Sequence, residues 1–194
     1  KNEISKIETL DNSSIVAVLL EPIQGEGGIK HFDNEFLSQL KLICEQKKWL
    51  FIADEVQCGM GRTGYWWSSK KNGVSPDVLT SAKGLGNGFP IGACLTSSKF
   101  NNIFEPGNHG STFGGNPLAC VASLETIKII EDEKLLDNAK IEGEKIINQL
   151  TTEYKDSSKI KEIRGAGLMI GIEFYEDCSK LNKIALENNV ILNI

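Results

Sequence analysis

The lysine at position 83 is the residue of this sequence best suited to covalent chemistry. It lies in the segment 81–88 (SAKGLGNG), which overlaps the end of the run 77–82 (DVLTSA). An amine held among glycines at the end of a buried strand can form a Schiff base with a carbonyl compound. The glycines also resemble a phosphate-binding loop, but that loop needs a helix after it, and Phe89-Pro90 follow here. The segment therefore favours carbonyl chemistry over dinucleotide binding.

Two carboxylates follow other apolar runs in the same way. Glu21 follows the run 15–20 (IVAVLL), and Asp54 follows the run 50–53 (LFIA). Ligands of open parallel sheets bind at the carboxyl ends of the strands, which all lie at one edge. Glu21 alone is better explained as a solvated strand-end charge. Asp54 together with Lys83 is predicted to belong to a site.

The elements that position these residues are predicted to be strands and helices of the α/β class. The apolar runs 15–20, 50–53, 77–82 and 91–96 predict buried parallel strands. A helix is predicted between the first two, starting after an N-cap at Asp33, because residues 36, 37, 40, 43 and 44 are apolar and share one face. A strand, a helix and a strand in this order predict a βαβ unit.

The second half of the chain is predicted to consist of helices and one hairpin. The predicted elements are a helix over 117–130, a second helix over 133–155, a hairpin over 160–174 and a third helix over 178–188. The composition changes near residue 131, so we predict one domain over 1–130 and another over 131–194. The last residues, 189–194, are typical of a strand interrupted within its run, and we expect the chain to be a fragment.

Composition and charge exclude several classes of function. The chain has 21 Lys and Arg against 26 Asp and Glu, a net charge of −5, which offers no basic surface for nucleic acid or an anionic membrane. No apolar run reaches the roughly 18 residues of a membrane helix. Five cysteines without C-x-x-C spacing argue against a disulfide framework and predict a cytoplasmic location. With two histidines they form no zinc pattern, so no metal is expected.

Four motifs together resemble those of the class III pyridoxal-phosphate (PLP) aminotransferases. They are, in the order of that family, 21–28 (EPIQGEGG), 54–57 (DEVQ) followed by 62–64 (RTG), 81–83 (SAK) and 110–117 (GSTFGGNP). The resemblance covers essentially the whole chain. It implies the fold-type I PLP-dependent transferase fold. Residues 1–130 would form the C-terminal half of the large, mostly parallel-sheet domain, and 131–194 an incomplete small α+β domain.

The resemblance implies a role for each matching residue near the cofactor. Lys83 would form the Schiff base with PLP and move a proton between substrate and cofactor, with its pKa lowered from about 10.4 by burial and by the charge of the cofactor. Asp54 would pair with the pyridine nitrogen and keep it protonated, which makes the ring an electron sink. Val56 would pack on the ring, and Gln57 would hydrogen-bond its phenolic oxygen. Glu55, within the same motif, is also predicted to bind the cofactor.

The resemblance also implies a homodimer with each active site built from two chains. Thr112 would bind the cofactor phosphate of the neighbouring subunit, and Ser111 would lie close to the substrate. Glu26 would lie in the substrate pocket and help to decide which arm of the substrate is held. The family's own phosphate-binding loop and an arginine for substrate carboxylate would lie outside this chain. We therefore expect the isolated chain to have little or no turnover.

The motif spelling in segments 59–64, 79–83, 89–93 and 111–119 is most similar to that of the N-acetylornithine branch of the family. Members of that branch transfer the terminal amino group of N-acetylornithine to 2-oxoglutarate, giving the semialdehyde and glutamate, in arginine biosynthesis. Ornithine, 4-aminobutyrate and succinylated diamino acids stay open as substrates. A PLP-dependent aminomutase or racemase and a non-catalytic remnant stay open as well.

Simpler structural roles are open for several of these residues. Val56 is equally typical of a core position, and Ser111 and Thr112 are equally typical of a turn before a helix. We expect Arg62 to anchor the long connection 57–76 through backbone or carboxylate contacts. We also expect the segment 164–168 (RGAGL) to be part of a structural hairpin.

Overall fold

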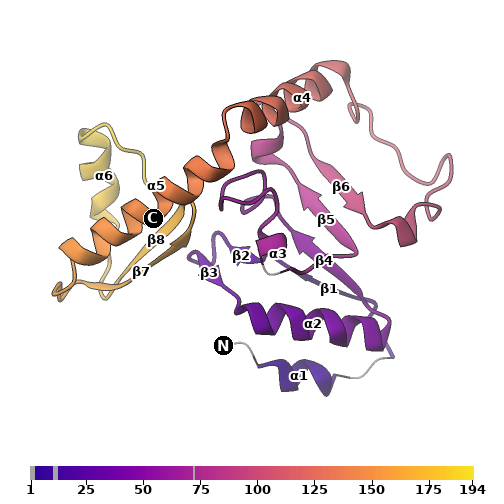
Figure 1. Cartoon of the computed structure of the whole chain (residues 1–194), viewed down its shortest axis with the longest axis horizontal. Helices are drawn as coiled ribbons and strands as arrows, with labels where there is room; N and C mark the ends of the chain where they lie inside the picture. Colours follow the sequence, from indigo (N-terminus) through magenta and orange to yellow (C-terminus); the bar gives the residue numbers. More distant parts are fainter. Residues whose placement is uncertain (1–2, 11–12, 72) are drawn as a thin grey trace.

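A four-stranded sheet forms the first half of the chain in the computed structural model, which describes residues 3–10, 13–71 and 73–194 (Figure 1). Its strands, in spatial order, are β1 (Ala17–Leu20), β4 (Leu50–Asp54), β5 (Val78–Ser81) and β6 (Ala93–Thr96). β4 is parallel to both β1 and β5, whereas β6 is antiparallel to β5. The predicted α/β class and the first three parallel strands are confirmed, but β1, at the edge of the sheet in this chain, has no buried residue.

The expectation of a buried parallel strand over residues 91–96 is wrong. Only residues 82–92, which include the short 3₁₀ turn η1 (Lys83–Leu85), join β5 to β6. A parallel return needs a crossover of a dozen or more residues, usually with a helix, so this short connection brings the chain back antiparallel. β6 is the last strand of the sheet, and all four of its residues are exposed in this chain.

One face of the sheet is covered by α2 (Asn34–Lys47) (Figure 1). The predicted apolar face of this helix is confirmed, since the five residues at 36, 37, 40, 43 and 44 are all buried. They form a core cluster with Trp49, Phe51 and Val74, and α1 (Ile4–Glu8) adds Ile4 and Ile7 to its outer side. This packing fixes β4 against α2, and Asp54, the last residue of β4, lies at the carboxyl edge of the sheet.

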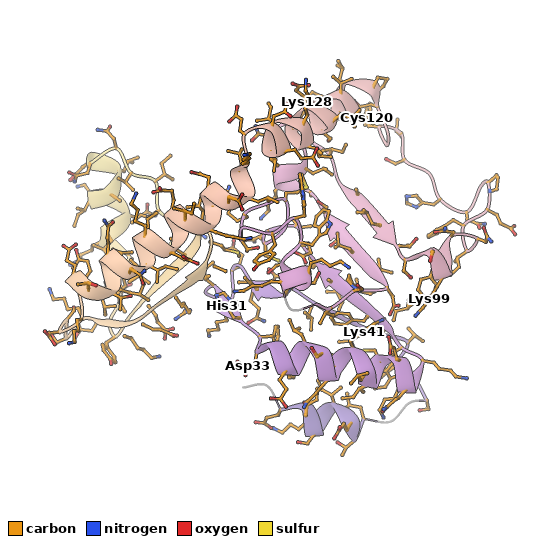
Figure 2. The ribbon with its side chains drawn as sticks, viewed as in Figure 1. His31, Asp33, Lys41, Lys99, Cys120 and Lys128 are labelled. Atoms are coloured by element: carbon orange, nitrogen blue, oxygen red, sulfur yellow. The ribbon has the colours of Figure 1, made fainter. Side chains whose placement is uncertain are left out.

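A buried carboxylate ties α2 to the opposite end of the sheet. Asp77 is 5% exposed, and its Oδ2 accepts hydrogen bonds from the backbone N–H of Phe51 at 3.0 Å and from Lys41 Nζ at 2.9 Å. Lys41 and the more distant Lys99 lie at this same end (Figure 2). Burial alone would raise the pKa of Asp77, but the Phe51 N–H and Lys41 outweigh it and hold the pKa below its usual value.

The second half contains the predicted helices and hairpin. They are α4 (Pro117–Asp132), α5 (Leu135–Glu153), β7 (Ile160–Ala166), β8 (Met169–Phe174) and α6 (Lys180–Glu187). The N-cap Asn116 accepts the N–H of Ala119 at 2.9 Å, as the Asn-Pro start predicts. The antiparallel β7–β8 hairpin packs against α5 (Figure 1). Gly143 of α5 allows this contact, because a Cβ there would lie 2.0 Å from the carbonyl oxygen of Gly167.

The remaining elements are short, and the chain end differs from the expectation. β2 (Ile23–Gln24) pairs with β3 (Lys30–His31), α3 spans Ser68–Lys71, and a 3₁₀ turn η2 spans Ser98–Phe100. Residues 190–194 form no strand and pair with none of the strands in the described part of the chain. No helix within the described residues is long and apolar enough to cross a membrane.

Replacing Asp77 with Ala is expected to lower the free energy of unfolding by about 2 kcal/mol, because the Phe51 N–H loses its buried acceptor and Lys41 its buried partner. Urea denaturation of the purified protein at pH 7 measures this change. Because the pKa of Asp77 is lower in the folded state, its contribution is fully present above a pH of about 3.9 and is lost as the pH falls through the folded pKa.

The matched control is Glu142→Ala, which removes an exposed ion pair with Lys145. That change is expected to cost less than about 1 kcal/mol. Two results would contradict the role assigned to Asp77. One is an equal loss of unfolding free energy in Asp77→Ala and Glu142→Ala. The other is a difference in unfolding free energy between wild type and Asp77→Ala that stays constant down to pH 2.

Candidate active site

Lys83, Val56 and Gln57 surround one hollow at the carboxyl edge of the sheet. This hollow, of about 360 Å³, also has Arg62 and Ile29 in its wall, and we call it the Lys83 hollow. Val56 and Gln57 lie in the turns after β4, and Lys83 begins η1 after β5 with a φ of +44°. Parallel pairing of β4 with β5 brings the two strand ends together. The structure therefore assembles these three predicted residues, although their roles stay predictions.

Asp54 is oriented by two hydrogen bonds to a single carboxylate oxygen. Its Oδ1 accepts the backbone N–H of Val56 at 3.0 Å and the hydroxyl of Thr80 at 3.0 Å. Its Oδ2 has no hydrogen-bond partner among the described residues. A half-buried carboxylate held in this way offers one oxygen to a cationic N–H donor. Thr80, opposite Asp54 on β5, is a positioning residue that the sequence motifs did not single out.

The prediction that Glu55 binds a cofactor is wrong, because its carboxylate points into the protein. The residue is 1% exposed, and its two oxygens accept the N–H groups of Ser68 and Ser69 at 2.7 Å each. The Cys58 thiol donates to it as well, at 3.3 Å. Burial first, and Glu55 second, raise the pKa of Cys58 and keep the thiol protonated. Glu55 thus anchors the connection 57–76 at the start of α3.

Glu26 reaches the edge of the site from the turn between β2 and β3, residues 25–28, which we call the glycine turn. Gln57 Nε2 donates to Glu26 Oε1 at 3.3 Å. The turn lies directly on Gln57, since a Cβ at Gly25 would come within 2.1 Å of its Oε1. Glu21 Oε2 accepts the N–H of Gly25 at 2.9 Å, so Glu21 holds this turn and is not simply a solvated charge.

Two expectations about the lysine and arginine need correction. Lys83 is exposed, so the expected burial is not provided by the described residues. The Arg62 guanidinium has no hydrogen bond or ion pair within the described chain, and it lines the Lys83 hollow instead. The backbone carbonyl of Arg62 does anchor the connection, since it accepts the N–H of Leu168 at 3.0 Å.

Ser111 and Thr112 are not brought to the Lys83 hollow within one chain. Both are exposed in the loop between η2 and α4. This loop projects on the side of the sheet away from the β7–β8 hairpin (Figure 1). Their proposed roles at the site of a neighbouring subunit stay predictions.

The hairpin contributes a wall of the Lys83 hollow that sequence reasoning missed. Residues 168–170, at its tip, line the hollow opposite Gln57 and Lys83. Beneath them, Ala166 and Met169 pack with Ile23, Cys58 and Ile29 in a small buried cluster. Residues 168–170 lie 85 to 87 positions beyond Lys83, and no local motif indicates such a contact. The segment 164–168, expected to be structural, therefore borders the site.

A family model described as aminotransferase class-III matches residues 1–193. The chain belongs to the class III aminotransferases. It is 49% identical over 184 residues to an acetylornithine aminotransferase of Nitrosomonas europaea, covering 95% of this chain and 47% of that protein. It is 43% identical over 182 residues to one of Methanosarcina acetivorans, covering 94% and 45%. The chain thus spans about half the length of the curated relatives it matches.

Solved class III aminotransferases have the same fold as this chain. An ornithine aminotransferase from Plasmodium yoelii superposes with a TM-score of 0.92 at 35% identity, over 99% of this chain and 52% of that one. An acetylornithine aminotransferase from Elizabethkingia anophelis gives 0.90 at 35% identity, over 98% and 50%. An ornithine aminotransferase from Toxoplasma gondii, described with PLP partly occupying its active site, gives 0.93 at 35%, over 100% and 47%.

The residues around the Lys83 hollow fit the PLP that class III aminotransferases use. Asp54 Oδ2, which has no partner among the described residues, offers the acceptor that a protonated ring nitrogen requires. Val56 offers an apolar side chain, Gln57 an amide, and Lys83 a primary amine, all within the wall of one hollow. These groups fit PLP, although their roles stay predictions.

Replacing Glu55 with Gln is expected to lower the free energy of unfolding by about 2 kcal/mol, because the amide NH₂ cannot accept from a backbone N–H of the connection. Urea denaturation of the purified protein measures it. Glu26→Gln, at an exposed carboxylate that accepts two long hydrogen bonds, from Gln57 and Asn193, is the control and is expected to change stability by less than about 0.5 kcal/mol. A Glu55→Gln protein as stable as wild type would contradict the anchoring role.

Proposed function

We propose that the intact protein carrying this chain is a PLP-dependent transaminase. It transfers the terminal amino group of N-acetylornithine to 2-oxoglutarate, giving the semialdehyde and glutamate. The observation that carries this proposal is the position of Asp54 and Lys83 in a class III chain. Asp54 ends β4, and Lys83 lies three residues beyond Thr80, which pairs with Asp54 on the parallel strand β5. Relatives named acetylornithine aminotransferase, 43–49% identical, support this choice of substrate.

Asp54 and residues that line the Lys83 hollow would divide the work of holding the cofactor. Asp54 would accept the N–H of the pyridine ring, and its negative charge would keep that nitrogen protonated. Val56 would pack on the ring, and the Gln57 amide would donate to the phenolic oxygen. When bound, PLP supplies an electron sink that stabilises negative charge on the substrate carbon.

Lys83 Nζ performs the covalent and proton-transfer steps of this chain. When PLP is bound, Lys83 would hold the cofactor covalently. Once released by the substrate amine, its Nζ would be the base and acid that moves a proton between the substrate carbon and the cofactor. Glu26, at the rim beside Gln57, faces the distal arm of the substrate.

Ornithine is the second candidate substrate, because solved ornithine aminotransferases superpose as well as the acetylornithine enzyme. The two differ in the charge of the α-nitrogen, which is cationic in ornithine and acylated in N-acetylornithine. A panel of N-acetylornithine, ornithine and 4-aminobutyrate, each with 2-oxoglutarate, separates them by kcat/KM. Turnover without 2-oxoglutarate would instead indicate an aminomutase or racemase.

We further propose a cytoplasmic homodimer whose two sites each use the Thr112 loop of the partner. Large apolar side chains lie uncovered on this loop and on the adjoining face of α4: Phe104 (68% exposed), Phe113 (80%), Leu118 (72%), Val121 (64%) and Leu124 (66%). Uncovered apolar surface of this extent is typical of an interface.

The free state of all five cysteines supports a reducing compartment. The α4–α5 joint at 133–134 supports the division into domains 1–130 and 131–194.

Replacing Lys83 with Ala is expected to abolish covalent capture of PLP. The intact protein is incubated with PLP and reduced with borohydride, and the pyridoxyl group is located by peptide mass spectrometry. Lys128→Ala is the control, since Lys128 is an exposed lysine on α4 (Figure 2) that does not line the hollow. Label at position 83 in wild type and the control, and none in Lys83→Ala, is the expected result. Unchanged labelling or activity of Lys83→Ala would refute the assigned role.

Mixing two inactive variants tests whether Thr112 acts across the dimer. Thr112→Val and Lys83→Ala are each expected to lose activity. Subunit exchange between them creates heterodimers with one intact site, so random pairing restores about a quarter of the wild-type sites. The activity of the refolded mixture is the measurement. No recovery, despite heterodimers detected by native mass spectrometry, would place Thr112 at the site of its own chain or at none.

A further inference from the structure

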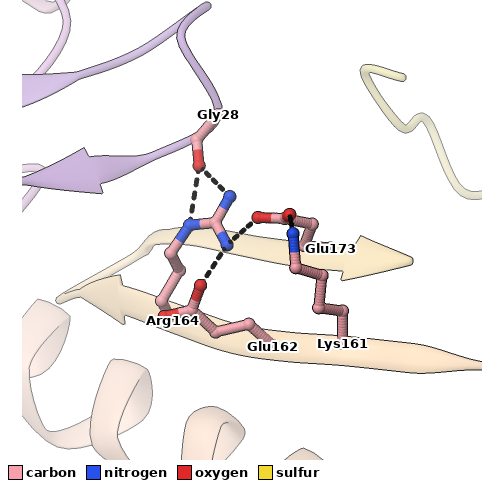
Figure 3. A network of polar contacts seen from close by, with 5 residues as sticks. All are labelled: Gly28, Lys161, Glu162, Arg164 and Glu173. Atoms are coloured by element: carbon pink, nitrogen blue, oxygen red, sulfur yellow. Dashed lines mark hydrogen bonds and ion pairs between the residues drawn. The ribbon is translucent and has the colours of Figure 1, made fainter. Parts of the chain in front are cut away.

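Arg164 joins the hairpin to the glycine turn through an unusually complete set of hydrogen bonds (Figure 3). Its Nε and Nη2 both donate to the carbonyl oxygen of Gly28, at 2.8 and 2.5 Å. Its Nη1 donates to Glu162 at 2.7 Å and to Glu173 at 2.6 Å. Lys161 also donates to Glu173. The side chain of Arg164 is only 14% exposed, so its guanidinium is committed to these partners.

The two parts that Arg164 joins both border the Lys83 hollow. Ile29, directly after the glycine turn, and residues 168–170 of the hairpin lie in its wall, together with residues of the segments 56–62 and 83–84. Their common apolar cluster is small, with Ile23, Cys58, Ala166 and Met169 as its buried members. A shift of the hairpin relative to the turn would therefore change the shape of the hollow.

The turn also carries Glu26, two residues before the carbonyl that Arg164 holds. Within the turn, the N–H groups of Gly28 and Ile29 both donate to the Gly25 carbonyl, at 3.0 and 3.2 Å. Glu26 itself has only exposed, long hydrogen bonds, to Gln57 at 3.3 Å and to Asn193 at 3.4 Å. The placement of its carboxylate thus depends on the backbone of the turn rather than on its own contacts.

We propose that Arg164 is a positioning residue that fixes the glycine turn, and with it Glu26, against the hairpin wall of the site. Two N–H groups of one guanidinium on one carbonyl oxygen set both the distance and the direction of the contact, which a lysine cannot do. This inference rests on the proposed transaminase function, in which Glu26 faces the substrate. It concerns substrate binding and not the covalent step at Lys83.

Hydrogen exchange of the intact protein, without substrate, tests the contact independently of activity. Arg164→Gln is expected to speed exchange of the Gly28 and Ile29 amides by about 10-fold or more, with the amides of β4 unchanged. Arg164→Lys is expected to fall between this variant and wild type. Lys161→Gln is the matched control, because it removes a partner of Glu173 but leaves both bonds to Gly28, and it is expected to exchange like wild type.

Steady-state kinetics with N-acetylornithine and 2-oxoglutarate then test the positioning role. Arg164→Gln is expected to raise KM by about 5-fold or more with kcat within about 2-fold, the pattern of lost binding common to ground and transition states. Unchanged exchange in the turn, faster exchange throughout the protein, or an unchanged KM would each overturn the proposal. If wild type captures PLP but transaminates neither N-acetylornithine nor ornithine, the proposed function fails. The hydrogen-exchange result still decides whether Arg164 holds the glycine turn.

Discussion

The parallel pairing of β4 with β5 is the constraint on which the candidate site depends. It sets Asp54 opposite Thr80, so that one hydroxyl and one backbone N–H orient the carboxylate and leave Oδ2 free. It also brings Lys83, three residues beyond Thr80, to the same edge. The helix α2 packs on β4 through Phe51, and Val74, in the connection before β5, belongs to the same buried cluster. A change of one residue in the register would separate the acid from the amine, because alternate side chains point to opposite faces.

The two consecutive acidic residues at the end of β4 have different roles. Asp54 lies at the edge where we propose that the cofactor binds, whereas Glu55 is buried and accepts hydrogen bonds from the N–H groups of Ser68 and Ser69. The long connection 57–76 can therefore carry Gln57 and Arg62 at the site without a regular element of its own beyond α3. The glycine turn and the hairpin complete the walls, and the Arg164 contact with Gly28 holds these two together.

Much of the fold could be predicted because its signals are local. The apolar periodicity of α2 and the Asn-Pro start of α4 each specify an element within a few residues. The direction of β6 could not be read from its composition, since a short apolar run is equally compatible with a buried parallel strand and an edge strand. The hairpin wall and the free guanidinium of Arg62 depend on contacts between distant segments. Glu55 was misassigned because its motif adjoins the site, while its burial is visible only in the structure.

The protonation of the cofactor ring nitrogen tests the central claim most directly. The intact protein, reconstituted with PLP labelled with ¹⁵N in the ring, is compared with its Asp54→Asn variant by NMR, after borohydride mapping has located the cofactor on Lys83 in both. We predict a protonated ring nitrogen near neutral pH in wild type and loss of that proton in the variant. An unprotonated nitrogen in wild type, or an equally protonated one in Asp54→Asn, would contradict the pairing of Asp54 with the ring.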